Sequence, residues 1–356
     1  MRTLGPGSLS AFRGKKVLVT GHTGFKGGWL TSMLLKLGAE PVGYSLETPS
    51  APSFFVETGL SDKCVDIRAD VLDIGRLKKV MREERPDVVF HLAAQPLVIR
   101  SYQEPLETFN VNVMGTANVL EAVRSCDSVR ACVCITSDKC YENLEQDYGY
   151  KEDDRMGGSD PYSASKGAAE LVISSYRRSF FKDRPIVASA RAGNVIGGGD
   201  WAEKRIVPDI VDCLTGNKPL ILRNPNSIRP WQHVLDPLNG YLVLASTIMR
   251  GDAQAADAWN FGPDGEARTV KQVAEIMMTA WGKNVPIEIV PNQNYHESKM
   301  LRLDCGKAHS GLGWKPLLDI DDAVRYTVDW YKGWSEGKDV FDITNRQIET
   351  FWGLSQ

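Results

Sequence analysis

Two residues of the segment YSASK, Tyr162 and Lys166, stand four positions apart. On a helix this spacing places both side chains on one face. A phenol has a pKa of about 10, but a nearby ammonium group lowers it. The pair could therefore remove a proton from an alcohol. Because Y-x-x-x-K is common by chance on solvated helices, its position in the chain decides its meaning.

A second reactive group lies in TSDKCY, where Ser137, Asp138 and Lys139 follow the apolar residues 133–135. Oxidation of an alcohol needs the hydroxyl, whereas elimination of water needs a further acid and a further base. Asp138 would be the acid if burial raises its pKa. A neutral Lys139 could abstract a proton, and a charged Lys139 could stabilise an enolate or position Asp138. As a surface pair on a loop, the two would contribute little.

The segment TGHTGFKGGW lies between an apolar run and a helical pattern, which indicates a dinucleotide-binding loop. Glycines there allow a pyrophosphate to approach the backbone at a helix N-terminus. Lys26 could contact phosphate or solvent. The expected cofactor contacts in the loop are Gly21, His22, Thr23, Gly24, Phe25, Lys26 and Gly27.

The choice between NAD and NADP is not clear from the second expected strand. That strand ends in GYSLETP, with Ser45 where an acid often binds the adenosine ribose and Glu47 two residues later. Asp66 and Ile67 are expected beside the adenine, although Asp66 could equally be a turn residue.

The elements that must position these groups alternate between strand and helix. We expect strands at 15–21, 41–46, 64–70, 87–94, 130–137 and 185–197, and helices at 27–40, 73–86, 108–126 and 160–181. Apolar strands separated by helices predict an α/β fold, a Rossmann-type doubly wound parallel sheet.

The pattern changes near residue 197, where loops and prolines become frequent. We therefore predict two domains. The dinucleotide-binding domain would comprise 12–196 plus about 231–262. A smaller α/β substrate domain would comprise about 197–230 plus 263–356.

Composition narrows the class of partner. The chain has 356 residues, of which 42% are hydrophobic and 24% charged, and a formal net charge of -3, which disfavours nucleic acid or a membrane surface as a partner. No stretch approaches the roughly 18 apolar residues of a membrane span, and the N-terminus does not read as a signal peptide. Seven cysteines without a C-x-x-C pair predict reduced thiols in a cytoplasmic protein, with no metal site.

Several segments together resemble the extended short-chain dehydrogenase/reductase superfamily, over nearly the whole chain. They are VLVTGHTGFKGG, HLAAQ, NVNVMGT, TSDKCY, DPYSASK, RAGNVIGGGDW, RPWQHVLDPLNGY and WNFGP. The combination of GHTGFKGGW, TSDKCY and RAGNVIGGGDW is similar to the CDP-glucose 4,6-dehydratase family. That family makes CDP-4-keto-6-deoxy-glucose, a precursor of deoxysugars in bacterial surface polysaccharides such as the lipopolysaccharide O-antigen.

The resemblance implies a cofactor, a substrate and roles for single residues. NAD would oxidise C4 transiently, with Ser137, Asp138, Lys139, Tyr162 and Lys166 as catalytic residues and Leu92, Ala93 and Ala94 beside the cofactor. The substrate would be CDP-glucose or a related nucleotide sugar, and a homodimer or homotetramer is implied. Substrate contacts would come from Gln95, Asn194, Ile206, Val207, Arg223, Arg229, His233 and Arg302, of which Arg223 and His233 could equally be structural. Lys299 could add charge near the nucleotide, and Trp201 and Trp231 could stack on a ligand or merely pack.

Three other functions remain open. A nucleotide-sugar 4-epimerase shares the C4 oxidation but does not need Asp138 and Lys139. A non-catalytic NAD-sensing protein would need none of Ser137, Tyr162 and Lys166. A dehydratase acting on another nucleotide hexose is a third possibility within the same fold.

Overall fold

One parallel sheet organises the chain, which we describe from a computed structural model covering residues 6–146, 148–182, 185–265, 268–290 and 301–354. Among these residues, seven strands form that sheet in the order β11-β6-β5-β4-β1-β2-β3. The order reverses direction between β1 and β4, as in a doubly wound fold, and confirms the predicted fold class. The strands are β1 (Lys16–Thr20), β2 (Glu40–Ser45), β3 (Val65–Arg68), β4 (Val88–His91), β5 (Ala131–Ile135), β6 (Ile186–Ala192) and β11 (Ala258–Phe261).

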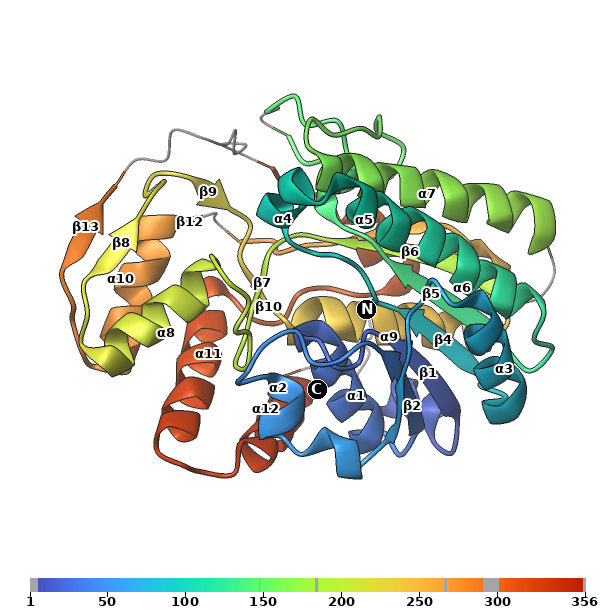
Figure 1. The fold of residues 1–356 in the computed structure, drawn as a ribbon, viewed down its shortest axis with the longest axis horizontal. Helices are drawn as coiled ribbons and strands as arrows, with labels where there is room; N and C mark the ends of the chain where they lie inside the picture. The colour runs from blue at the N-terminus through green and yellow to red at the C-terminus, as the bar shows by residue number, and fades with distance from the viewer. Residues whose placement is uncertain (1–5, 147, 183–184, 266–267, 291–300, 355–356) are drawn as a thin grey trace.

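Helices cover both faces of the sheet (Figure 1). Strands β4 and β5 are buried along their whole length, which requires apolar cover on either side. Helices α3, α6 and α7 share one apolar core with the sheet, and α1 and α9 share the other. The helices of this part are α1 (Phe25–Lys36), α2 (Phe54–Glu57), α3 (Ile74–Glu84), α4 (Val98–Gln103), α5 (Pro105–Phe109), α6 (Gly115–Arg124), α7 (Pro161–Phe180) and α9 (Leu235–Met249), with 3-10 turns η1 (Pro6–Phe12), η2 (Leu60–Asp62), η4 (Asp138–Cys140) and η5 (Ala253–Ala255).

The single helix expected at 108–126 is interrupted in the structure. A π-helical turn, η3 (Asn110–Met114), separates α5 from α6. Its Asn112 is buried and bonds the backbone of Gln95 and the hydroxyl of Ser165 on α7. Such turns are often found at functional sites, and this one joins the end of β4 to the helix that carries Tyr162.

The remaining strands form three small two-stranded sheets among the described residues. They pair β7 (Val195–Ile196) with β10 (Gln232–His233), β8 (Leu220–Leu222) with β13 (Ile287–Ile289), and β9 (Ile228–Arg229) with β12 (Arg268–Thr269). Helices α8 (Ile206–Gly216) and α10 (Val270–Trp281) lie beside β8 and β13 (Figure 1). The other elements are η6 (Ala308–Leu312), α11 (Ile320–Ser335) and α12 (Val340–Gly353).

An aromatic cluster joins α11 to the large sheet. The Trp330 ring stacks on Phe54, with centroids 5.9 Å apart, and Phe54 stacks on Trp29 at 5.1 Å. The Trp29 indole donates to the carbonyl of Gly198, 2.9 Å away. A Cβ atom on Gly198 would lie 2.0 Å from the Trp330 ring. The loop that follows β7 and contains Gly198 is therefore packed directly against α11.

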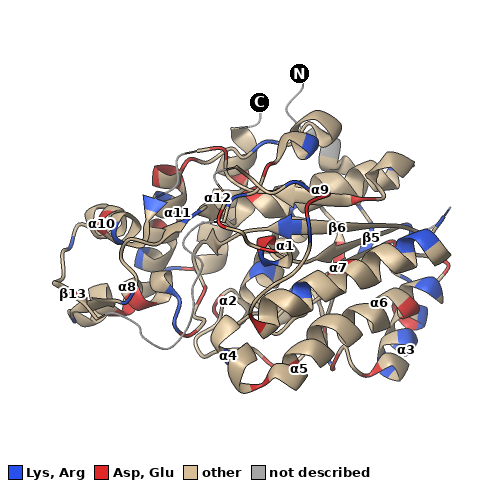
Figure 2. Cartoon of the chain, turned by 90° about the horizontal axis from the view of Figure 1, so that it is seen from above, with Lys and Arg blue, Asp and Glu red and all other residues tan. Residues whose placement is uncertain are grey.

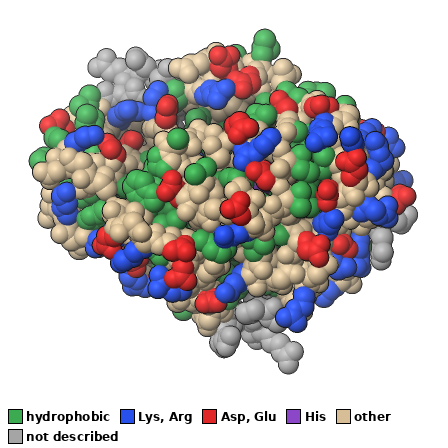
Figure 3. All heavy atoms as spheres, turned by 60° about the horizontal axis from the view of Figure 1, so that its bottom comes forward, with side chains coloured by type: hydrophobic (Ala, Val, Ile, Leu, Met, Phe, Trp, Pro, Cys, Tyr) green, Lys and Arg blue, Asp and Glu red, His purple; other side chains and the backbone are tan. Residues whose placement is uncertain are grey.

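Charge is mixed over the surface. Helices α3 and α6 carry basic and acidic residues along the same turns (Figure 2), and the face in Figure 3 shows both signs interspersed. Within the described ranges, no helix is both long and apolar enough to cross a membrane.

We predict that Gly198→Ala lowers the free energy of unfolding by about 3 kcal/mol, because the new methyl group overlaps a fully buried indole. Urea denaturation followed by tryptophan fluorescence would measure the change. Gly353→Ala is the control, since a Cβ there meets nothing within 4 Å. Equal stability of the two variants would contradict the packing described.

Candidate active site

The Ser-Asp-Lys turn begins directly after β5, at the carboxyl edge of the sheet. Ser137 caps the 3-10 turn η4 by accepting from the Lys139 backbone N–H, and its hydroxyl donates to the Asp138 carboxylate, 2.9 Å away. Ser137 and Asp138 are buried, and Lys139 is half-buried. Ligands of open parallel sheets bind at this edge, so the turn faces the expected site.

Helix α7 brings Tyr162 and Lys166 to the same place. Asp160 caps the helix and Pro161 opens it, as the sequence indicated. The Ser137 side chain acts to lower the pKa of Tyr162, so the two lie close together, and both Tyr162 and Lys166 are buried. Ser137, Asp138, Tyr162 and Lys166 thus form one cluster at the end of β5.

Burial shifts the pKa values of this cluster towards the uncharged forms. It raises the pKa of Asp138, although Lys139, Ser137 and Lys26 oppose the rise. It lowers the pKa of Lys166 to about 8, against the opposing charge of Glu170. The pKa of Tyr162 is raised to about 12, so burial outweighs the opposing effect of the Ser137 side chain in the protein alone. The lowering expected for this phenol must therefore come from a charge that a bound ligand adds.

Two further cations face this cluster. Burial lowers the pKa of Lys26 to about 8, the charge of Arg205 lowers it further, and Asp138 raises it. The charges of Asp138 and Lys166 both act on Lys26, so Lys26 lies near the catalytic cluster, and its contact with phosphate stays a prediction. Arg205 caps α8, pairs with Asp200 at 2.8 Å, and couples electrostatically to Tyr162. Sequence reasoning missed Arg205, because only the fold brings 205 near 162.

The glycine loop fits a dinucleotide. Gly21 has φ 78°, and a Cβ on it would lie 2.8 Å from the Ala93 backbone nitrogen. A Cβ on Gly27 would lie 2.1 Å from the Gly21 carbonyl oxygen. Gly24 is the N-cap of α1, so the free N–H groups of the first turn, at Phe25 and Lys26, face the loop. The glycines therefore let the loop pack tightly against the residues that follow β4, and the N-terminus of α1 that the loop leads into suits an anionic group.

On the expected adenine side, two side chains of the protein hold the Asp66 carboxylate. His22 is buried, and its Nε2 lies 2.8 Å from the Asp66 carboxylate. Arg68 bonds the same carboxylate, and these bonds lower the pKa of Asp66 although burial acts to raise it. Thr23 bonds the Ser45 hydroxyl at 2.9 Å, so the second strand reaches the loop through Ser45. Ile67 is half-buried on β3, and Leu92, Ala93 and Ala94 follow β4.

The expected substrate residues surround the outer part of the site. Asn194 stands between β6 and β7, and a Cβ on its neighbour Gly193 would lie 3.0 Å from the Asp138 carboxylate. Ile206 and Val207 open α8, and Arg223 is exposed and couples to Asp209 on that helix. Arg229 lies on β9.

A small cavity lies next to Arg229. It is lined by Pro230, Trp231, Arg302 and Leu303, among others. Arg268 pairs in register with Arg229 on the neighbouring strand, and the sequence reading missed it. This region therefore collects guanidinium groups suited to phosphate. Lys299 lies outside the described residues.

Three expected contacts have packed or internally bonded side chains. Gln95 is buried, and its amide bonds Thr108 and the backbone of Leu97. His233 is fully buried between Trp29 and Tyr326, which favours a structural role. Trp201 packs against Trp330, Tyr331 and Trp334, as tryptophans more often do than stack on a ligand. No group of three potential metal ligands occurs among the residues that the structure describes.

Comparison with known proteins agrees with this arrangement. The family model described as GDP-mannose 4,6 dehydratase matches residues 18–327. A CDP-glucose 4,6-dehydratase of Salmonella typhimurium is 46% identical over 347 residues, covering 96% of this chain and 97% of that protein. A dTDP-glucose 4,6-dehydratase of Streptomyces antibioticus is 27% identical, over 89% of this chain and 92% of that protein.

A solved structure gives the same fold. The UDP-glucose 4-epimerase of Thermus thermophilus, solved in complex with NAD, superposes with a TM-score of 0.78 at 26% identity, over 89% of this chain and 99% of that chain. The resemblance drawn from the sequence is thereby confirmed. The chain belongs to the nucleotide-sugar 4,6-dehydratase family that the matching model describes, within the epimerase and dehydratase superfamily.

Proposed function

We propose that this protein is an NAD-dependent hydro-lyase that converts CDP-D-glucose to CDP-4-dehydro-6-deoxy-D-glucose. One observation carries the proposal: a buried Asp138 stands beside Lys139 and is hydrogen-bonded to Ser137, which lies close to Tyr162. An epimerase has no use for an acid and a base aimed at C5 and C6. The product would serve the synthesis of surface deoxysugars such as those of the lipopolysaccharide O-antigen.

Oxidation at C4 uses Tyr162 and Lys166 of helix α7 together with Ser137. The Ser137 hydroxyl would bond the C4 oxygen, and Tyr162 would take the hydroxyl proton as the C4 hydrogen leaves as hydride. NAD, when bound, accepts that hydride and later returns it to C6. Gly21, Gly24 and Gly27 would hold its pyrophosphate, as the closeness of Gly27 to the Gly21 carbonyl supports. Lys166, as an ammonium, would favour the phenolate.

Elimination uses the other two residues of the turn. The C4 ketone acidifies the C5 proton, which Lys139 would remove. Asp138, whose pKa is raised by burial, would donate its proton to the departing C6 hydroxyl, so that one water leaves. Hydride then returns to C6 and a proton to C5. The cycle is redox-neutral, which suits a site where cofactor and substrate stay together.

The nucleotide is assigned from similarity and supported by the basic region. The relative named for CDP-glucose is 46% identical, against 27% for the relative named for dTDP-glucose. Arg302 lines the small cavity of Pro230 and Trp231, and Arg229 on β9 precedes Pro230, so guanidinium groups that suit a diphosphate are present in this region. The predicted division into two domains stays a prediction.

We also propose a homo-oligomer, a dimer or a tetramer, in the cytoplasm. Large apolar side chains are exposed along α4, α5, η3 and α7, namely Tyr102, Leu106, Phe109, Met114, Leu171 and Phe180. An exposed apolar surface of this kind marks an interface. All seven cysteines lie in the described residues, none is in a disulfide, and six are buried, which suits a reducing compartment.

A panel of nucleotide sugars tests the reaction itself. Incubated with CDP-, dTDP-, UDP- and GDP-glucose, the protein should convert the CDP sugar to a product lighter by one water, detected by mass spectrometry. An unchanged mass with a new sugar stereochemistry would indicate an epimerase. Unreacted sugars in every tube would refute both enzyme readings.

Lys139→Ala should retain C4 oxidation and lose elimination by roughly 100-fold or more, because it removes the base proposed for the C5 proton. Incorporation of solvent deuterium at C5 measures the step. The control is Lys151→Ala, which removes an exposed lysine from the same segment of chain. Normal deuterium incorporation by Lys139→Ala would show that Lys139 is not the base.

The rate of C4 oxidation should fall as the pH rises through about 8, because Lys166 then loses the proton that favours the Tyr162 phenolate. A single turnover, followed by nicotinamide absorbance at saturating cofactor, measures this rate. Lys26 also has a pKa of about 8, so the variant Lys26→Met tests which of the two lysines causes the fall in rate. The fall should persist in that variant, and its disappearance would assign it to Lys26 instead.

A further inference from the structure

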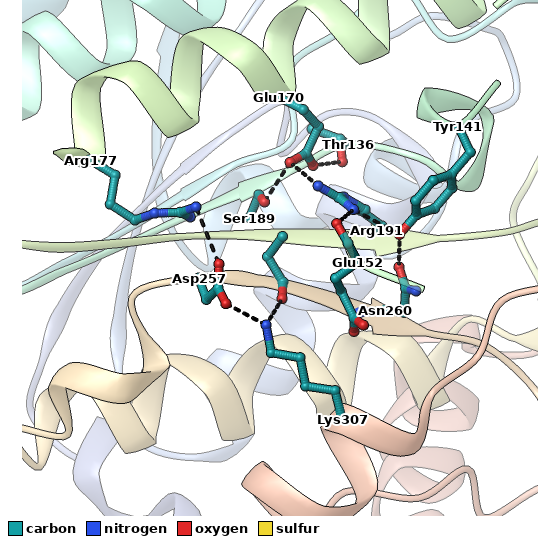
Figure 4. A network of polar contacts seen from close by, with 11 residues as sticks. Thr136, Tyr141, Glu152, Glu170, Arg177, Ser189, Arg191, Asp257, Asn260 and Lys307 are labelled. Carbon is teal, nitrogen blue, oxygen red and sulfur yellow. Dashed lines mark hydrogen bonds and ion pairs between the residues drawn. The ribbon is translucent and has the colours of Figure 1, made fainter. Parts of the chain in front are cut away.

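A buried ion pair lies behind the catalytic cluster. Arg191 on β6 and Glu170 on α7 are 2.8 Å apart, with side chains 1% and 3% exposed (Figure 4). Although burial acts against both charges, their attraction keeps the pKa of Glu170 below and that of Arg191 above the ordinary values. Both therefore stay charged in the interior. Breaking such a pair is costly, yet its net contribution to stability is small, so its value must be sought elsewhere.

The carboxylate of this pair holds the start of the Ser-Asp-Lys turn. Thr136 immediately precedes Ser137, and its hydroxyl donates to one Glu170 oxygen, 2.5 Å away. The backbone N–H of Thr136 donates to Ala190 on β6 at 2.9 Å. Thr136 is therefore fixed both to the sheet and to the catalytic helix.

The guanidinium holds the end of the same turn. Tyr141 immediately follows η4, and Arg191 donates to its hydroxyl, 2.7 Å away, while lying over its ring. The Tyr141 hydroxyl in turn donates to Asn260 on β11 at 2.7 Å. Figure 4 shows Thr136 beside Glu170 and Tyr141 beside Arg191.

The third attachment is the catalytic helix itself. Glu170 lies one helical turn after Lys166 on α7, so both side chains share a face. A single ion pair thus connects the residue before the turn, the residue after it, and the helix that carries Tyr162 and Lys166.

We propose that Glu170 and Arg191 are a positioning pair that sets the Ser137–Lys139 turn at the correct distance from Tyr162 and Lys166. This inference rests on the proposed dehydratase function, in which the turn and the helix act on adjacent carbons of one sugar. Hydrogen bonds to charged groups fix direction as well as distance, which apolar packing at the same place would not do. Glu170 and Arg191 do not touch substrate in this proposal.

The test compares three hydrogen bonds to this ion pair, two from residues that border the Ser-Asp-Lys turn and one from a residue that does not. Thr136→Val and Tyr141→Phe each release one end of the turn. Ser189→Ala removes another bond to Glu170, 2.8 Å long, from a β6 residue that does not border the turn. If the pair is purely structural, activity should follow stability in all three variants. If the pair positions the turn, kcat should fall in Thr136→Val and Tyr141→Phe but not in Ser189→Ala.

We expect Thr136→Val and Tyr141→Phe to lower kcat roughly 10-fold to 100-fold with a smaller change in KM, since a misplacement of about 1 Å costs this much. Ser189→Ala should stay within about 2-fold of wild type at a similar fall in Tm. Equal kcat for all three variants, or a loss in Ser189→Ala as large as in the others, would overturn the proposal.

Crystal structures of the three variants give a second measurement that does not depend on activity. The separation between the Ser137 and Tyr162 hydroxyl oxygens should increase in Thr136→Val and Tyr141→Phe and stay unchanged in Ser189→Ala. An inactive wild type on the nucleotide-glucose panel would refute the proposed function, and this separation would still decide the positioning inference. An unchanged separation in all variants would reject it.

Discussion

Burial of ionisable groups at the carboxyl end of β5 is the constraint on which the site depends. Asp138, Tyr162 and Lys166 are all buried, and burial moves each towards its neutral form. For an acid that must hold its proton near neutral pH, this is useful. For a tyrosine that must act as a base it is adverse, because its pKa rises to about 12. Burial shifts the pKa of all three groups towards the neutral form, but the acid and the base need opposite charge states. The charges around the cluster must therefore offset this shift differently for Asp138 and for Tyr162.

The surrounding charges are arranged to do so. Lys26 and Lys139 oppose the rise in the pKa of Asp138. The Glu170 carboxylate opposes the loss of charge on Lys166, and Arg191 keeps that carboxylate ionised. Lys139 and Glu170 are close in sequence to the groups they affect, whereas Lys26 and Arg191 come from distant segments that the parallel sheet brings to the same place. The fold thus places an acid and a base close together in one small buried region.

Much of this was predictable from sequence, and the rest depends on tertiary contacts. Buried parallel strands and the glycine loop have local signatures, so the fold and the places of Ser137 and Tyr162 followed from pattern. The π turn at Asn112 did not, because its cause is a bond to Gln95 across the sheet edge. Arg205 was missed for the same reason, and the burial of His233 came from aromatic neighbours distant in sequence.

The two halves of the proposed reaction differ in whether the protein alone shifts the pKa of the acting residue in the useful direction. For Asp138, burial in the protein alone already acts to raise the pKa, since burial needs no ligand to act. For Tyr162, burial raises the pKa in the protein alone, and the positive charges of Lys166 and of bound NAD would lower it. In the proposed reaction, oxidation at C4 therefore gains from a filled cofactor site, whereas the shift that favours Asp138 as the acid for elimination needs no ligand.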